Sequence, residues 1–142
     1  MEQVNNGTNL VLPDDVTITK KNSEVLFKSP DKLEIDECIV DVGPETLEQM
    51  KELLKDAKTL VWNGPLGSYE LGFKDKTESL AEMVAKLTIE NGLESIVGGG
   101  DTVASISSLG LEHKFSFIST GGGAMLDFLV DETLVGIKAL EN

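Results

Sequence analysis

The stretches 95–105 (SIVGGGDTVAS) and 116–126 (SFISTGGGAML) have the same shape. Each is a short apolar run followed by three glycines and then by a segment of helical character. A strand that passes through a tight turn into a helix produces this pattern. Strand and helix alternation of this kind predicts an α/β fold, with a parallel sheet and helices packed on both of its faces.

The segments before these turns extend the alternation. The run from Gly43, GPETLEQMKELLKDA, has proline in its first turn and predicts a helix. TLVWNG (59–64) predicts a strand that ends at a glycine. A second helix is expected from about Asp75, with Glu78 completing a capping box, to Asn91 and Gly92. The apolar residues expected on the buried faces of the two helices are Leu47, Met50, Leu53, Leu54, Ala57, Leu80, Met83, Val84 and Leu87.

The first forty residues have weaker signals. Residues 1–9 are polar and resemble the frayed end of a helix. NLVLP (9–13) suggests a short strand that stops at Pro13, and residues 14–40 alternate only in pieces (VTITK, EVLFK), which indicates strands and loops. At 142 residues, the chain is expected to form a single domain.

The amino-acid composition limits the classes of partner that the chain is expected to bind. The chain has 25 acidic and 12 basic residues, a formal net charge of -13, and every basic residue is a lysine. Nucleic acids and anionic membranes require clustered positive charge, so neither is expected as a partner. Without a membrane-length apolar run or a secretory leader, a cytoplasmic protein is expected. Cys38, the single cysteine, is expected in the core.

Three predicted strands end in turns, after Trp62, Val97 and Thr120. In an open parallel sheet such turns lie at one edge, where ligands bind. Glycine allows a ligand to approach the backbone, and the start of the next helix offers unpaired N–H groups to an anion. Two triglycine turns at one edge therefore suit a phosphorylated ligand. The alternative is that the glycines only permit tight turns or close helix–strand packing.

Individual side chains in these turns each allow two interpretations. Asp101 would either cap the helix that follows it or hold Mg²⁺ bound to phosphates. Thr102 would bond a phosphate or simply occupy the first helical turn. Asn63 would donate to a phosphate or stabilise its own turn, and Glu70 would bind ribose or lie on the surface as a solvated acid.

Together, VWNGPLGSYE (61–70), GGGDTVAS (98–105) and FSFISTGGGAMLDFL (115–129) closely resemble the carboxy-terminal domain of phosphoglycerate kinase. DVGPET (41–46) and LVGIKAL (134–140) are further similar segments, so the resemblance runs from about Leu10 to the end. It implies a Rossmann-like sheet, incomplete at its N-terminal side, in a lobe that binds ADP or ATP with Mg²⁺. The implied reaction moves a phosphoryl group between 1,3-bisphosphoglycerate and ADP.

The resemblance also implies roles for individual residues. Asn63 and Pro65 would lie along the nucleotide, Glu70 would bind its ribose, and Asp101 would serve the metal. The implied phosphate-binding residues are Gly99, Gly100, Asp101 and Thr102, and the implied catalytic positions are Gly100, Gly122 and Gly123. Two positions depart from the family pattern: Ile39 stands where a glycine near the adenine is expected, and Val135 where proline is usual.

The sequence has no counterpart of the family's first lobe, which would bring the basic patch for phosphoglycerate, or of a Gly-Ala-Lys stretch near the nucleotide phosphates. Phosphoryl transfer depends on positioning and on neutralising the moving charge. The chain alone is therefore predicted to be inactive as a kinase, and to meet 3-phosphoglycerate or 1,3-bisphosphoglycerate only together with that lobe. The alternative is a non-catalytic nucleotide- or phosphate-binding module, or one that self-associates through an exposed sheet edge.

Overall fold

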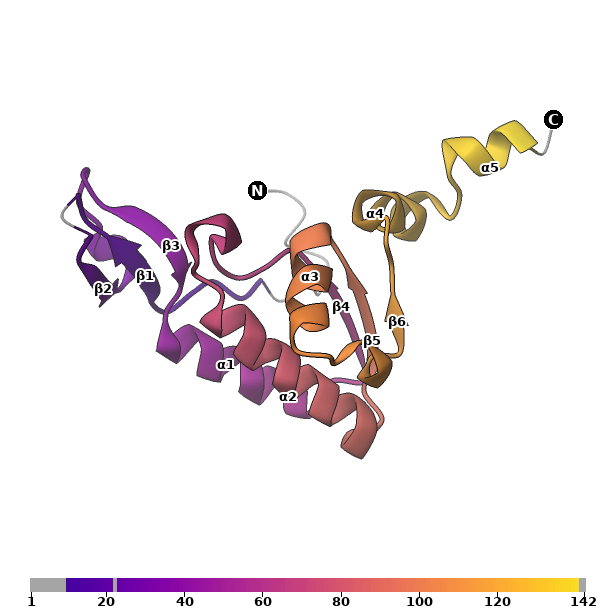
Figure 1. Cartoon of the computed structure of the whole chain (residues 1–142), viewed down its shortest axis with the longest axis horizontal. Helices are drawn as coiled ribbons and strands as arrows, with labels where there is room; N and C mark the ends of the chain where they lie inside the picture. The colour runs from indigo at the N-terminus through magenta and orange to yellow at the C-terminus, as the bar shows by residue number, and fades with distance from the viewer. Residues whose placement is uncertain (1–9, 22, 141–142) are drawn as a thin grey trace.

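The computed structural model describes residues 10–21 and 23–140, whose arrangement is shown in Figure 1. The strands are β1 (Val16–Thr19), β2 (Val25–Lys28), β3 (Cys38–Val42), β4 (Thr59–Asn63), β5 (Glu94–Gly98) and β6 (Phe117–Ile118). The helices are α1 (Pro44–Lys55), α2 (Asp75–Asn91), α3 (Gly100–Ser108), α4 (Gly122–Asp131) and α5 (Val135–Leu140), with short 3-10 turns η2 (Pro30–Lys32), η3 (Tyr69–Leu71) and η4 (Glu112–Lys114). The prediction for residues 1–9 lies outside the described residues.

The later half of the chain forms the predicted parallel sheet. Its order is β4-β5-β6, with Trp62 beside Val97 and Val97 beside Ile118. Both triglycine segments join a strand to a helix, β5 to α3 and β6 to α4. The α/β class, the parallel pairing and the flanking helices are thus confirmed.

One face of this sheet carries the main core. Alternation along β4 and β5 turns Trp62 and Val97 toward α1, α2 and α3, and both side chains are buried. The apolar residues of this core are Leu47, Trp62, Leu80, Ala81, Val84, Ala85, Leu87, Leu93, Val97, Ile106 and Phe115. The predicted buried face of α2 is confirmed, whereas Leu53 on α1 is 54% exposed, contrary to expectation.

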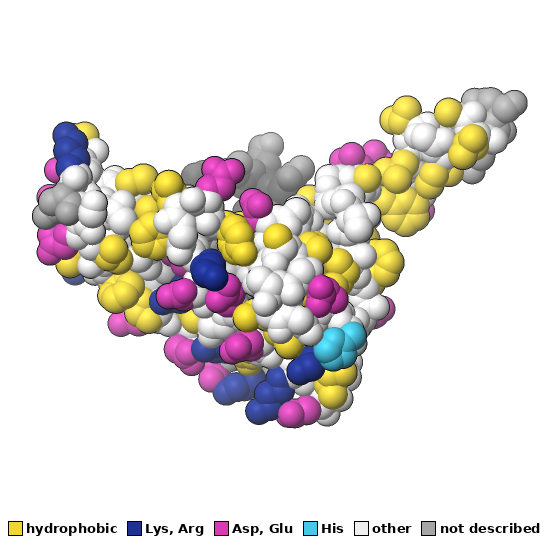
Figure 2. Space-filling model, in the orientation of Figure 1, with side chains coloured by type: hydrophobic (Ala, Val, Ile, Leu, Met, Phe, Trp, Pro, Cys, Tyr) yellow, Lys and Arg dark blue, Asp and Glu magenta, His cyan; other side chains and the backbone are white. Residues whose placement is uncertain are grey.

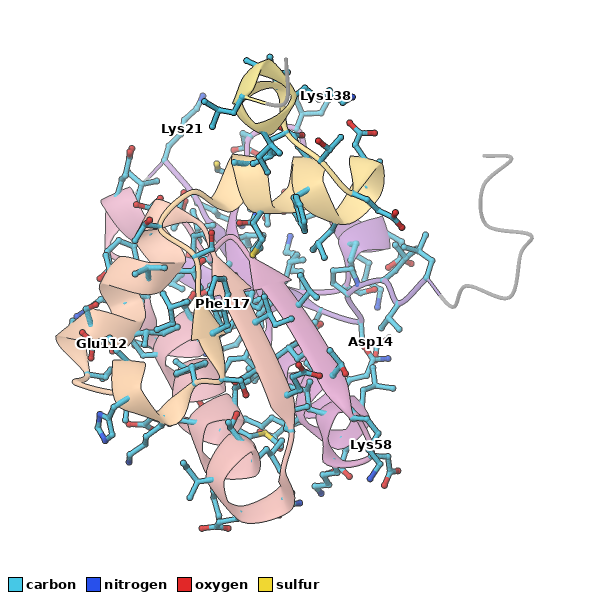
Figure 3. The ribbon with its side chains drawn as sticks, turned by 90° about the vertical axis from the view of Figure 1, so that its right-hand side faces the viewer. Asp14, Lys21, Lys58, Glu112, Phe117 and Lys138 are labelled. Carbon is cyan, nitrogen blue, oxygen red and sulfur yellow. The ribbon has the colours of Figure 1, made fainter. Side chains whose placement is uncertain are left out.

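The opposite face of the sheet is covered only at its carboxyl end. On the open part of this face, neighbouring strands place Val61, Ile96 and Phe117 side by side. Val61 is 44% exposed and Phe117 57% exposed. α4 packs over the end of β5, where Met125 reaches Gly98. Figure 3 shows this face, with Phe117 labelled and α4 across the strand ends, opposite Lys58. α5 extends away from the body, and hydrophobic side chains are visible on α4 and α5 in Figure 2.

The earlier part of the chain forms a second, antiparallel sheet with the order β2-β1-β3. Sequence alternation indicated strands here but not their pairing. The short strand expected before Pro13 is wrong, since residues 10–13 have no strand structure. Cys38 is exposed rather than buried, because it begins β3 at the far end of this small sheet.

Two helix starts differ from expectation in an informative way. At α1, the carboxylate of Asp15 accepts hydrogen bonds from the N–H groups of Glu45 (3.2 Å) and Thr46 (2.8 Å). This supplies a cap from thirty residues away. At α2 the predicted capping box is wrong: Lys74 is the N-cap, no side chain caps the helix, and Glu78 instead pairs with Lys74 at 3.0 Å.

No helix among residues 10–21 and 23–140 combines the length and the apolar character needed to cross a membrane.

Candidate functional site

The three strand-end turns meet at one edge of the parallel sheet. A β-carbon on Gly122 would lie 2.4 Å from the amide nitrogen of Gly99 and 2.6 Å from Oδ1 of Asn63. A β-carbon on Gly98 would likewise lie 3.1 Å from Oδ1 of Asn63 and from the Cα of Gly122. The ends of β4, β5 and β6 therefore pack directly together, with the Asn63 side chain between the two triglycine turns.

Backbone conformation explains further glycines of this edge. Gly99 has φ 90° and Gly64 has φ 100°, a region that side chains with a β-carbon rarely adopt. The indole N–H of Trp62 donates to the carbonyl oxygen of Gly64 at 2.7 Å, which fixes the turn after β4. Trp62 is thus both a core residue, as predicted, and an anchor of this turn.

The third glycine of each triplet is placed differently. Nothing lies within 4 Å of where a β-carbon of Gly100 or Gly123 would be. Gly100 is the first residue of α3 and Gly123 the second residue of α4, and neither helix has a side-chain cap. Unpaired N–H groups at the starts of α3 and α4 therefore lie on either side of Gly99 and Gly122, which pack against each other. Such an arrangement attracts an anion, since the positive dipole ends and the N–H groups act together.

Asp101 and Thr102 follow Gly100 in the first turn of α3. Asp101 is exposed, and because α3 has no side-chain cap, the capping role considered for it is not observed. Thr102 is fully buried, and its hydroxyl oxygen is buried without a hydrogen-bond partner. A buried hydroxyl of this kind, close to the Gly99 turn, has a hydrogen bond still to give.

The loop after β4 carries the remaining predicted site residues. Asn63 is exposed, although its Oδ1 reaches both triglycine turns, and Pro65 is half-buried. Glu70 is exposed in η3, and no described contact joins it to the packed glycines. The structure therefore brings together Asn63, Gly99, Asp101, Thr102 and Gly122, while Glu70 lies on the loop that leaves this edge.

A metal ion at this edge would need oxygen atoms from a bound phosphorylated ligand to complete its coordination. Within the described residues, no three His, Cys, Asp or Glu side chains are grouped to hold a metal. Asp101 offers one exposed carboxylate, and Mg²⁺ in phosphate sites is often held by one or two carboxylates with phosphate oxygens completing its shell. The residues present thus fit Mg²⁺ that arrives with a phosphorylated ligand.

A pocket of about 540 Å³ lies beside β4, away from the starts of α3 and α4. It is lined by residues 11–13, by residues of α1, and by residues 60–66 of β4 and the turn that follows it, which include Asn63 and Pro65. It does not include Gly99, Asp101 or Thr102, so it adjoins the candidate phosphate edge without containing it.

Sequence analysis assigned no role to Asp41, which the structure places next to the loop after β4. Asp41 is 5% exposed on β3, and a β-carbon on Gly67 would lie 2.5 Å from its Cγ. Burial raises the pKa of Asp41 to about 6, although a hydrogen bond from the Val42 N–H and the charge of Lys76 oppose this. An acidic residue within the run IVDV was the only sequence signal for such a group.

The chain is similar to known proteins of one family. The family model for phosphoglycerate kinase matches residues 1–132. The chain is 43% identical to the phosphoglycerate kinase of Dictyoglomus turgidum and 44% identical to that of Zymomonas mobilis, over 96% and 95% of its length. It spans 35% of each of these relatives.

Solved structures show the same similarity. The phosphoglycerate kinase of Coxiella burnetii has a TM-score of 0.77 and 40% identity, covering 92% of this chain and 34% of that one. The enzyme from Pyrococcus horikoshii has a TM-score of 0.73 and 31% identity, covering 91% of this chain and 32% of that one.

Proposed function

The chain belongs to the phosphoglycerate kinase family, and we propose that its strand-end turns form the part of a kinase site that binds ADP or ATP with Mg²⁺. The reaction would transfer a phosphoryl group between 1,3-bisphosphoglycerate and ADP. In this proposal residues 1–142 act as one partial nucleotide-binding lobe, and the protein is cytoplasmic.

The observation that carries the proposal is the pair of uncapped helix starts at one sheet edge. Gly100 and Gly123 leave open space at the starts of α3 and α4, while Gly99 and Gly122 hold the two turns together. One start would bind the nucleotide phosphates and the other the phosphoryl group being transferred. Fixed N–H groups stabilise negative charge without having to reorganise during the reaction.

Asp101 is the residue proposed to hold the metal. Its carboxylate lies in the first turn of α3, next to the start of the helix that would bind phosphate. Bound Mg²⁺ would supply neutralisation of phosphate charge. Thr102 would donate its unpaired hydroxyl to a phosphate oxygen once a small shift of the turn exposes it.

The loop after β4 would orient the rest of the nucleotide. Asn63 and Pro65 stand at the end of β4, beside the Gly99 turn, and would lie along the nucleotide. Glu70, exposed on η3, would accept hydrogen bonds from ribose hydroxyls. Both assignments follow the family resemblance.

Kinase turnover by this chain alone is proposed to be negligible. The net charge is -13, and none of the 12 basic residues falls in 63–68, 98–102 or 119–123. Phosphoryl transfer requires neutralisation of the moving group, which backbone amides and one metal supply only in part. Phosphoglycerate would bind only together with an amino-terminal lobe.

The proposal is tested by calorimetric titration of the chain with ADP in excess Mg²⁺. Asp101→Asn should weaken binding by about tenfold or more, the loss expected for a charge-assisted contact. Asp56→Asn is the matched control, because it removes the same charge from an exposed residue at the opposite end of β4. Equal affinity in the wild type and both variants would contradict the metal role. Clear turnover of 3-phosphoglycerate and ATP by the pure chain would contradict the proposed inactivity.

A second candidate function is self-association without catalysis. The apolar row Val61, Ile96 and Phe117, in which Val61 and Phe117 are exposed, favours it, because soluble monomers rarely leave such a row open beside exposed apolar helices. The strong net negative charge opposes it. Nucleotide binding separates the two candidates, since an assembly module has no need of it.

A further inference from the structure

The loop after β4, residues 64–73, is hydrogen-bonded to β3. The N–H of Ser68 donates to the carbonyl oxygen of Val40 at 2.7 Å, and the N–H of Phe73 donates back to the carbonyl oxygen of Ser68 at 3.2 Å. Leu66 adds a bond from its N–H to the hydroxyl of Thr77 at 3.0 Å. Glu70 therefore lies on a segment that is closed at both ends against β3 and α2.

Asp41 lies where the two ends of that segment meet. A β-carbon on Gly67 would be 2.6 Å from Oδ2 of Asp41 and 2.4 Å from the carbonyl oxygen of Phe73. Both oxygens thus lie next to the same point, on the side of Gly67 where a side chain would project. The other carboxyl oxygen of Asp41 accepts a hydrogen bond from the N–H of Val42 at 2.8 Å.

We propose that Asp41 is a positioning residue for the loop 64–73. When its carboxyl group is protonated, it holds the loop against β3 through a hydrogen bond. When the carboxyl group is ionised, this hydrogen bond is lost and the loop is held less tightly. In the neutral acid, the O–H donates to the carbonyl oxygen of Phe73. After the proton leaves for solvent, a carboxylate oxygen and a carbonyl oxygen lie on the same side of Gly67, next to the same point, and repel each other. This inference rests on the proposed function, because the loop carries Pro65 and Glu70.

The surroundings of Asp41 allow both states. A pocket of about 260 Å³, lined by Thr17, Asp41, Phe73, Asp75 and Lys76 among others, gives the carboxyl a route for proton exchange. From α2, Asp75 and Lys76 act on Asp41 with opposite charges, while β1 presents only the neutral Thr17 opposite it. Lys76 is directed to the ring of Phe27 on β2, 5.8 Å from its centre. The charge of Lys76 favours the ionised carboxyl, but within the described residues no ion pair to Asp41 is formed.

The raised pKa of Asp41 agrees with this geometry, because burial disfavours its charged form. Because this pKa is about 6, the protonated and the ionised forms of Asp41 can both be populated in ordinary buffers.

The test is an NMR titration of the ¹⁵N- and ¹³C-labelled chain between pH 4.5 and 8, without nucleotide. The amide signals of Gly67, Ser68, Glu70 and Phe73 should shift together, with the same midpoint as the side-chain carboxyl carbon of Asp41. In Asp41→Asn these amide shifts should be lost, because the amide group donates at every pH. In the control Asp75→Asn the shifts should persist with a lower midpoint, since the charge of Asp75 raises the pKa of Asp41.

Loop shifts that persist in Asp41→Asn, or that follow a midpoint different from that of the Asp41 carboxyl carbon, would overturn the proposal. The second comparison uses the wild type alone and stands even if the variant does not fold. A separate titration with ADP and Mg²⁺ at pH 7.5 distinguishes the two proposals. Loop titration without nucleotide binding would refute only the proposed function, and nucleotide binding without loop titration would refute only the role of Asp41.

Discussion

Gly122 and Gly99 are in direct backbone contact: a β-carbon on Gly122 would lie 2.4 Å from the amide nitrogen of Gly99 and 2.9 Å from its Cα. Two motifs more than twenty residues apart in sequence are therefore one structural unit. The glycines within each triplet have different structural roles. Gly98, Gly99 and Gly122 allow the strand ends to pack, whereas Gly100 and Gly123 leave the helix starts open.

This division predicts opposite outcomes for neighbouring substitutions in α4. Gly122→Ala should destabilise the chain by about 1–3 kcal/mol, because the new methyl group meets backbone that cannot rotate away. Gly123→Ala should be neutral or stabilise by up to about 1 kcal/mol, because alanine favours the helix and meets nothing within 4 Å. Urea denaturation measures both, and equal effects of the two changes would refute the contact.

The cap of α1 provides a test of the antiparallel sheet as a support for the fold. Asp15→Ala should cost about 1–2 kcal/mol, because the N–H groups of Glu45 and Thr46 lose their acceptor. Asp14→Ala, a change at the exposed neighbouring residue, should have little effect. Thermal unfolding of the two variants gives the comparison, and a similar loss in both would mean that charge rather than capping is responsible.

Asp41 predicts a pH dependence with a definite sign. Its pKa is raised in the folded chain to about 6, so the folded state binds the proton more tightly than the unfolded state. The penalty for burying its charge is present above pH 6 and is relieved as the pH falls toward 4. Asp41→Asn should therefore be more stable than the wild type at pH 7, by about 1–3 kcal/mol, and equal to it near pH 4. Denaturation curves at both values check this, and a constant difference would contradict it.

The open sheet face predicts behaviour in solution. If the row Val61, Ile96 and Phe117 mediates self-association, Phe117→Glu should shift a concentrated sample toward monomer. Ile89→Glu, which changes an apolar residue 65% exposed on α2, should not. Sedimentation velocity over a range of concentrations measures the shift. A wild type that is monomeric throughout would remove self-association as a candidate function.

The sequence predicted those elements whose signals are local. The bounds of α1 and α2, the presence of β4 and β5 and the turns after both strands follow from periodicity, proline and glycine. Trp62 was correctly expected in the core. These features depend on neighbours within one or two turns of chain, which is the range over which composition is informative.

The features that sequence missed depend on contacts between distant segments. The pairing of β1 with β3 joins strands of four and five residues, too short for their alternation to specify a partner. The Asp15 cap and the Asp41–Gly67 contact link residues about thirty and twenty-six positions apart. Within the triplets, no local rule distinguishes Gly122 from Gly123, because their different roles arise only when the turns meet.

If the three converging turns bind a magnesium nucleotide, an amide NMR titration of the chain with ADP and Mg²⁺ detects this binding most directly. The amide shifts should gather on residues 63–70, 98–102 and 121–124, and Asp101→Ala should weaken them. Shifts confined to the pocket beside residues 11–13, or no shifts at millimolar nucleotide, would contradict it.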